Sequence, residues 1–149
     1  MTIRFDRLAQ IADHLEKGQL IHPVFDFRYF NTCDDDETPL PPHAPPHCGT
    51  NGCAVGEFPA IWPQDWHFDT KDPFSALPRL RHAHNKHVES DVCDWLGLDM
   101  NAYYHLFVPS SQEPGDFGGQ VLYRDATKDQ VAANIRAFIA TMQAQDAAT

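Results

Sequence analysis

The chain has 149 residues, of which 42% are apolar, and it carries ten Phe, four Tyr and three Trp. This length fits one domain, here taken as residues 1–149, and it can bury a sizeable core without metal or disulfides. Twenty-one acidic against eleven basic residues give a formal charge of −10. The resulting field repels phosphate and anionic membrane surfaces, which disfavours direct binding of nucleic acid.

The N-terminal stretch, MTIRFDRLAQIADHLEKG, carries charges throughout and lacks the apolar run of a signal peptide. No segment approaches the roughly twenty apolar residues that cross a bilayer. We therefore expect a cytoplasmic protein without membrane contact. Its cysteines should stay reduced in that compartment. They are Cys33, Cys48, Cys53 and Cys93.

Helical spacing of apolar residues begins near the N-terminus. The positions i, i+3, i+4 and i+7 are occupied by Leu8, Ile11, Ala12 and Leu15. They predict an amphipathic helix with Thr2 as its N-cap and Gly18 as its end. The following segment, residues 24–30, alternates partly between apolar and polar side chains and favours a short strand or an extended arm.

Residues 31–47 read NTCDDDETPLPPHAPPH and combine an acidic run with five prolines. Proline interrupts both helices and central strands, so this segment should be a surface loop with polyproline character. The acids of residues 34–37 lack the ligand spacing and glycine of a calcium loop, and we interpret them as solvated charges.

The next segment, residues 47–57, reads HCGTNGCAVGE. Our preferred interpretation is a tight glycine turn that leads into a short buried helix near Cys53. Thr50 or Asn51 would cap that helix. Pro59 disfavours helical geometry in the residue before it, so the helix should end there or kink.

The same segment offers two chemical alternatives. Cys48 and Cys53 are separated by four residues, which lies within zinc-knuckle spacing. The candidate ligands for zinc are His43, His47, Cys48 and Cys53, with Cys33 as a further donor. Alternatively, Cys53 could be a nucleophile, because the first turn of a helix lowers the pKa of a thiol. His47 or His43 would then be its base.

A second histidine-rich segment, residues 81–87, reads RHAHNKH. If it is helical, His84, His87 and Asp91 share one face and could present two imidazoles and a carboxylate to a metal. Arg81 and Lys86 would oppose a cation there, so an exposed polar helix start is the preferred interpretation. Upstream, the aromatic residues of 62–68 are expected in a loop that folds back on the core.

Two further helices should follow as a compact pair. The first is marked by Val88, Val92, Cys93 and Leu96 and closed by Gly97. Asp99 should cap the second, which ends before Pro109. The inner face of that helix is assigned to Met100, Tyr103, Tyr104 and Phe107. Its lack of Arg or Lys argues against a DNA-reading helix–turn–helix.

The C-terminal third contains a glycine-rich loop, residues 110–119, and a candidate strand, residues 121–123. Thr127 followed three residues later by Gln130 is a capping box. It predicts a final helix whose apolar stripe comprises Val131, Ile135, Phe138, Ile139 and Met142.

The Cys48–Pro59 segment resembles a CGTxGCAxG-type core found in small uncharacterised bacterial and phage-borne proteins. The likeness extends over residues 25–29, 104–109 and 126–139. It implies a shared fold nucleus and a mobile-element setting, but it supplies no catalytic residue. The chain has no GxGxxG, P-loop, HExxH or GxSxG motif, which removes support for nucleotide-dependent and serine-hydrolase chemistry.

The sequence therefore predicts a mainly α domain of about five helices, with long proline-rich loops and a minor two-stranded element. For function, we expect a non-enzymatic acidic interaction protein, a phage or prophage accessory or inhibitor that binds a protein partner with a basic surface. The alternative is a small metal- or cysteine-dependent hydrolase centred on His47, Cys48, Cys53 and Glu57, with zinc as the cofactor considered. The partner and the oligomeric state stay open.

Overall fold

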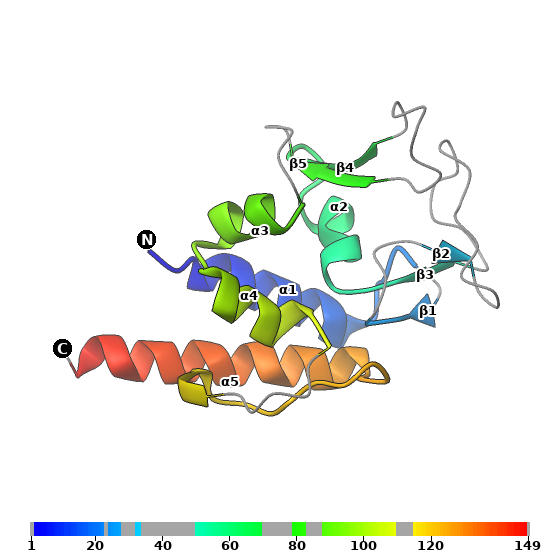
Figure 1. Ribbon diagram of the computed structural model, residues 1–149. Helices are drawn as coiled ribbons and strands as arrows, with labels where there is room; N and C mark the ends of the chain where they lie inside the picture. Colours follow the sequence, from blue (N-terminus) through cyan, green and yellow to red (C-terminus); the bar gives the residue numbers. More distant parts are fainter. Residues whose placement is uncertain are drawn as a thin grey trace.

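The computed structural model describes residues 2–22, 24–27, 32–33, 50–69, 79–82, 88–109 and 115–148. Within these ranges the chain is mainly helical (Figure 1). The α-helices are α1 (Phe5–Lys17), α2 (Phe58–Ile61), α3 (Val88–Leu96), α4 (Met100–Phe107) and α5 (Lys128–Ala147). Two 3₁₀ helices, η1 (Val55–Glu57) and η2 (Gly115–Phe117), accompany them. The prediction of a mainly α fold with about five helices is confirmed.

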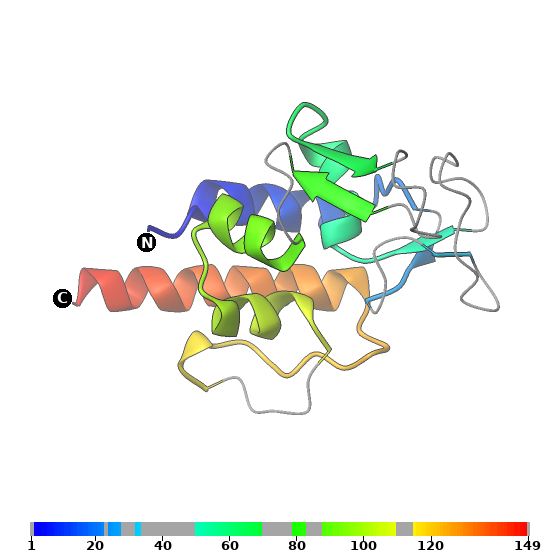
Figure 2. The same ribbon diagram turned by 45° about the horizontal axis from the view of Figure 1, so that its top comes forward.

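Helices α1 and α5 form the centre of the fold and run side by side in opposite directions (Figures 1 and 2). The predicted stripe of α1 is buried, and α5 buries Val131, Ile135 and Phe138 against the same core. On the surface, the guanidinium of Arg136 in α5 donates hydrogen bonds to Asp13 and Glu16 in α1. Apolar burial thus joins the two helices, and the ion pairs of Arg136 connect them on the surface.

The two ends of the chain show one correct and one wrong cap prediction. Thr127 accepts a hydrogen bond from the backbone of Gln130 at 3.2 Å, while the Gln130 side chain accepts from the Thr127 backbone at 2.8 Å. This confirms the capping box. Thr2, however, does not cap α1. The N-cap is Arg4, whose backbone N–H donates to the carbonyl of Leu96 at 2.8 Å, so the end of α3 fixes the start of α1.

Helices α3 and α4 form the predicted compact pair. Gly97 adopts a left-handed conformation with φ of 67°, and Asp99 caps α4 by accepting a hydrogen bond from Ala102 at 2.8 Å. The inner face of α4 is partly wrong in our prediction. Tyr103 and Phe107 are buried, together with the neighbouring Ala102 and Leu106. Met100 and Tyr104 point outward with 41% and 50% exposure, since the buried stripe is rotated toward positions 102 and 106.

Two small sheets complete the part of the fold that the structure describes. One has the order β1 (Val24–Phe25), β3 (Thr50–Gly52), β2 (Thr32–Cys33), with β1 parallel and β2 antiparallel to β3. The other is an antiparallel pair of β4 (Trp66–Asp69) and β5 (Arg79–His82). The described residues therefore contain the predicted minor β-element, with β4 and β5 as a two-stranded pair, and a three-stranded sheet in addition. The expected loop around Trp66 is partly a strand, whereas residues 121–123 form none, although Leu122 is buried.

The short helix after Cys53 also differs from the prediction. It begins as η1 with Ala54 as N-cap, since Thr50 and Asn51 belong to β3. Helix α2 then continues through Pro59, which lies in its first turn. Proline is tolerated there because the first turn of a helix has no intrahelical partner for its N–H groups.

An aromatic cluster anchors α2 to α1 and α3. The ring of Phe58 makes edge contacts with Trp62 and Trp66, each with centroids 5.0 Å apart. Trp95 of α3 continues the cluster at 5.7 Å from Trp62, and the guanidinium of Arg7 lies 3.5 Å from its ring centroid. Such ring pairs contribute beyond their buried area, so the cluster holds the three helices together.

None of the helices that the structure describes combines the length and the apolar character needed to cross a membrane. Of the loop predicted at residues 31–47, only Thr32 and Cys33 lie within the described residues, and of the loop predicted at residues 110–119, residues 110–114 lie outside them.

Two left-handed glycines allow a matched test of the α1–α3 junction. A Cβ added at Gly97 would lie 2.0 Å from the carbonyl oxygen of Thr2, whereas among the described residues one at Gly18 would meet only the Lys128 side chain at 3.8 Å. We expect Gly18→Ala to cost about 1–2 kcal/mol of unfolding free energy from backbone strain alone. Gly97→Ala should cost about 2–5 kcal/mol, because a backbone clash adds to the same strain. Urea denaturation measures both, and equal losses would contradict the proposed junction.

Candidate functional site

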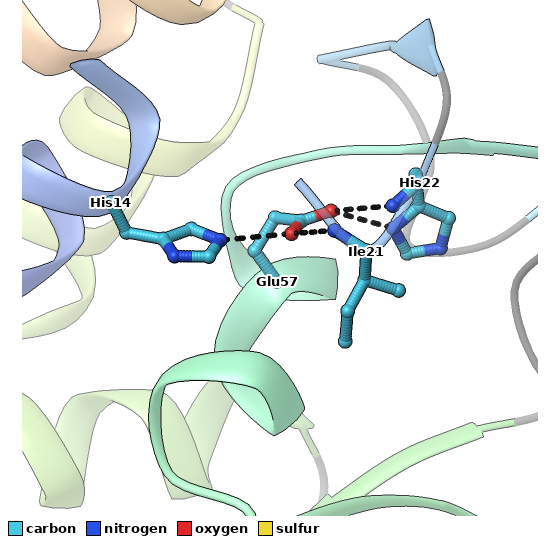
Figure 3. A network of polar contacts seen from close by, with 4 residues as sticks. All are labelled: His14, Ile21, His22 and Glu57. Atoms are coloured by element: carbon cyan, nitrogen blue, oxygen red, sulfur yellow. Dashed lines mark hydrogen bonds and ion pairs between the residues drawn. The ribbon is translucent and has the colours of Figure 1, made fainter. Parts of the chain in front are cut away.

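The most unusual side chain of the described core is Glu57, a carboxylate with no exposed surface. It projects from η1 into the space between α1 and the segment that leads into β1 (Figure 3). A carboxylate in such a place is strongly destabilised unless hydrogen-bond donors surround it.

Four donors surround Glu57. Its Oε2 atom accepts from the backbone N–H of Ile21 at 2.6 Å and contacts Nε2 of His14 at 3.0 Å. Its Oε1 atom lies 2.8 Å from Nδ1 of His22 and accepts from the backbone N–H of the same residue at 3.1 Å. The carboxylate thereby connects η1 with α1 and with the segment before β1.

These contacts decide the ionisation of Glu57. Burial alone would raise its pKa, but the hydrogen bonds from His14, His22 and the two backbone amides lower the pKa to about 2. The ionised carboxylate accepts hydrogen bonds only, so His14 must carry a proton on Nε2 and His22 a proton on Nδ1. In a neutral ring the lone pair then lies on Nδ1 of His14 and on Nε2 of His22.

The geometry gives Glu57 a positioning role. Two donors at each oxygen occupy the lone-pair directions that a base or a nucleophile would use. The two imidazoles lie on opposite sides of the carboxylate (Figure 3), so they do not converge on one ion. Among the described residues, no group of three or more His, Cys, Asp or Glu side chains is arranged to hold a metal.

Of the zinc ligands predicted from the sequence, Cys53 lies within the described residues, as does the backbone of the further donor Cys33. His43, His47 and Cys48 lie outside them. Cys53 is 2% exposed, and burial raises the pKa of its thiol to about 11. The expectation of a helix-activated thiol at Cys53 is therefore wrong, because desolvation outweighs the nearby backbone donors.

The second histidine-rich segment is also only partly within the described chain. His84 and His87 lie outside it, and α3 begins at Val88. Asp91 is buried on α3 with 2% exposure, and its Oδ2 atom has no hydrogen-bond partner among the described residues. A metal site formed by His84, His87 and Asp91 therefore stays a prediction.

A shallow hollow of about 320 Å³ lies between β1 and the turn that precedes α5. Its lining includes Phe25 and Phe27 from the β1 segment and Arg124 and Asp125 from the turn. Asp26 also lines the hollow, so its charged residues are two acids and one base.

The HCGTNGCAVGE segment draws attention to Glu57 but to neither of its histidine partners. His14 and His22 lie 43 and 35 residues away along the chain, and neither belongs to a recognisable motif. Comparisons with protein-family models, with curated proteins and with solved structures found no significant match.

The Glu57 cluster predicts a strong effect of an isosteric substitution. Glu57→Gln replaces one acceptor oxygen by an amide NH2 group, which is a donor. This NH2 group would point at the backbone N–H of either Ile21 or His22, and that N–H would lose its acceptor. We expect a loss of about 3–5 kcal/mol in unfolding free energy at neutral pH. The control is Glu16→Gln, which removes an exposed carboxylate that pairs with Arg136 and should cost at most about 1 kcal/mol.

The same variant tests the ionisation state. Because the pKa of Glu57 is lowered from 4.5 to about 2, its stabilising effect is complete above pH 4.5 and is lost as the pH falls toward 2. The difference in stability between wild type and Glu57→Gln should therefore shrink by about 3 kcal/mol across this window. Denaturant titrations at several pH values measure it, and a constant difference would show that Glu57 is not buried in its ionised form.

Proposed function

We propose that the chain is a non-enzymatic interaction protein that binds a protein partner with a basic surface. The observation that carries this proposal is the distribution of its net charge of −10. Exposed carboxylates occur on several helices and in the segments between them. They include Asp6, Glu16, Glu89, Asp94, Asp129 and Asp146.

Such a surface favours association with a positively charged partner. Complementary charges steer the encounter of two proteins and raise the association rate, with an effect that decreases as salt is added. The internal carboxylate of Glu57 supports the same function, since its hydrogen bonds hold the fold and engage both of its oxygens. The role as a phage or prophage accessory or inhibitor rests on the CGTxGCAxG-type motif alone.

Capture on immobilised protein tests this function. We expect a partner of positive net charge to be retained at low salt and released at about 0.5 M NaCl, because a Debye length of a few ångströms screens exposed charges. The matched control is an unrelated acidic protein of similar length and charge. Retention indistinguishable from that control, together with measurable hydrolytic turnover, would contradict the proposal.

The alternative function, a metal- or cysteine-dependent hydrolase, is favoured by one specific observation. Glu57 fixes His22 through Nδ1, as carboxylates do for histidines that bind metals or act as bases. His22 precedes β1, and the paired ends of β2 and β3 bring the backbone of Cys33 opposite Thr50. Strands β1 and β2 flank β3, so the segment that follows His22 and the backbone of Cys33 belong to one small sheet.

Cysteine labelling and elemental analysis test this alternative. Cys53 and Cys93 should alkylate slowly at neutral pH, because burial raises the pKa of each thiol to about 11. The hydrolase function predicts either one zinc per chain or one fast thiol, Cys33 or Cys48. Slow labelling of all four cysteines in metal-free protein would exclude both forms of it.

A further inference from the structure

One surface at the junction of α3 and α4 combines exposed apolar side chains with acidic ones. The apolar members are Met100 and Tyr104, with 41% and 50% exposure. They lie four residues apart on α4 and therefore share one side of the helix. Together with the exposed acids Glu89, Asp94 and Asp99, they are called the α3–α4 face below.

Contacts with Cys93 show that these residues are close together. The Sγ atom of Cys93 lies 3.5 Å from the sulfur of Met100 and 3.8 Å from the carbonyl oxygen of Asp99. After burial, the causes that raise the pKa of this thiol are the negative charges of Asp94, Asp99 and Glu89. The three carboxylates therefore act on the same thiol that contacts Met100.

The second apolar member is fixed by a buried neighbour. The ring of Tyr104 makes an edge contact with that of Tyr103, with centroids 5.6 Å apart, and Tyr103 is itself 2% exposed. Tyr104 thus stands on a rigid base and presents its outer surface to solvent. Rigid tyrosines and adaptable methionines are side chains that protein interfaces use often.

We propose that the α3–α4 face is the docking site for a basic amphipathic helix of a partner protein. A stripe of two side chains one turn apart matches the apolar stripe of a partner helix. The surrounding carboxylates match lysines or arginines that flank such a stripe. This inference rests on the proposed function and adds to it the site and the kind of partner.

The test uses a designed probe, because the natural partner is not identified. The probe is a fluorescent helical peptide of Leu and Lys with its leucines on one face, and its control has the same composition in scrambled order. We expect fluorescence anisotropy to show tighter binding of the amphipathic peptide. Met100→Ser with Tyr104→Ser should weaken that binding about tenfold or more, since central aromatic and apolar side chains dominate interface energies.

The control for the apolar change is Val24→Ser, which removes an apolar side chain of 45% exposure from β1. Strand β1 lies at the opposite end of the molecule from the α3–α4 connection (Figure 1). This variant should bind the peptide like wild type. All the substituted side chains are exposed, and thermal melts verify that each variant is folded.

A charge variant tests the acidic part of the face. Glu89→Gln with Asp99→Asn removes two charges and keeps an N-cap for α4, because asparagine caps helices as well as aspartate does. It should weaken binding severalfold at low salt and less at high salt. The matched control, Asp125→Asn with Asp129→Asn, removes two exposed charges near the start of α5 and should have a smaller effect.

Two results would overturn this docking site. One is equal binding of the amphipathic and scrambled peptides, which would mean that charge alone attracts the probe. The other is equal binding by the Met100/Tyr104 variant and the Val24 control. If a captured partner is retained by the Met100/Tyr104 variant, the docking site is wrong although the proposed function stands. If capture fails but the peptide results agree with expectation, the α3–α4 face stands without the proposed function.

Discussion

The fold depends on the ionised carboxylate of Glu57 in its interior. Moving a carboxylate out of water costs several kcal/mol even after relaxation, so the chain must supply compensating donors in fixed positions. It does so from two segments distant in sequence, with His14 on α1 and the amides of Ile21 and His22 before β1. None of these donors can move far without leaving the charge unsatisfied.

This requirement places the short elements around α1. Because Glu57 is the last residue of η1, fixing its side chain also fixes the start of α2 and hence Phe58, whose ring begins the aromatic cluster. His22 lies two residues before β1, so the same contact locates the strand that pairs with β3. One polar cluster thus sets the position of both the small sheet and the cluster of tryptophans relative to α1.

How much of the fold and of the Glu57 cluster the sequence predicts depends on how far apart along the chain the interacting residues lie. The helices α1, α3, α4 and α5 follow from local apolar spacing, and Thr127 and Gln130 cap α5 through contacts three residues apart. Glu57 is different, because its partners are 35 and 43 residues away and no spacing rule connects them. Strands β4 and β5 were not predicted for the same reason, because strand pairing brings together residues that are distant in sequence, such as Trp66 and His82.

Met100 and Tyr104 of α4 were predicted to be buried but are exposed. Met100 and Tyr104 have the spacing of core residues, and the pattern alone assigns them to the interior. The core instead uses Ala102, Tyr103, Leu106 and Phe107, which form a second apolar stripe on the same helix. A helix of eight residues with apolar side chains on two sides has more apolar surface than the core covers. The uncovered side lies among carboxylates, so the partner that we propose for it would supply positive charge as well as apolar surface.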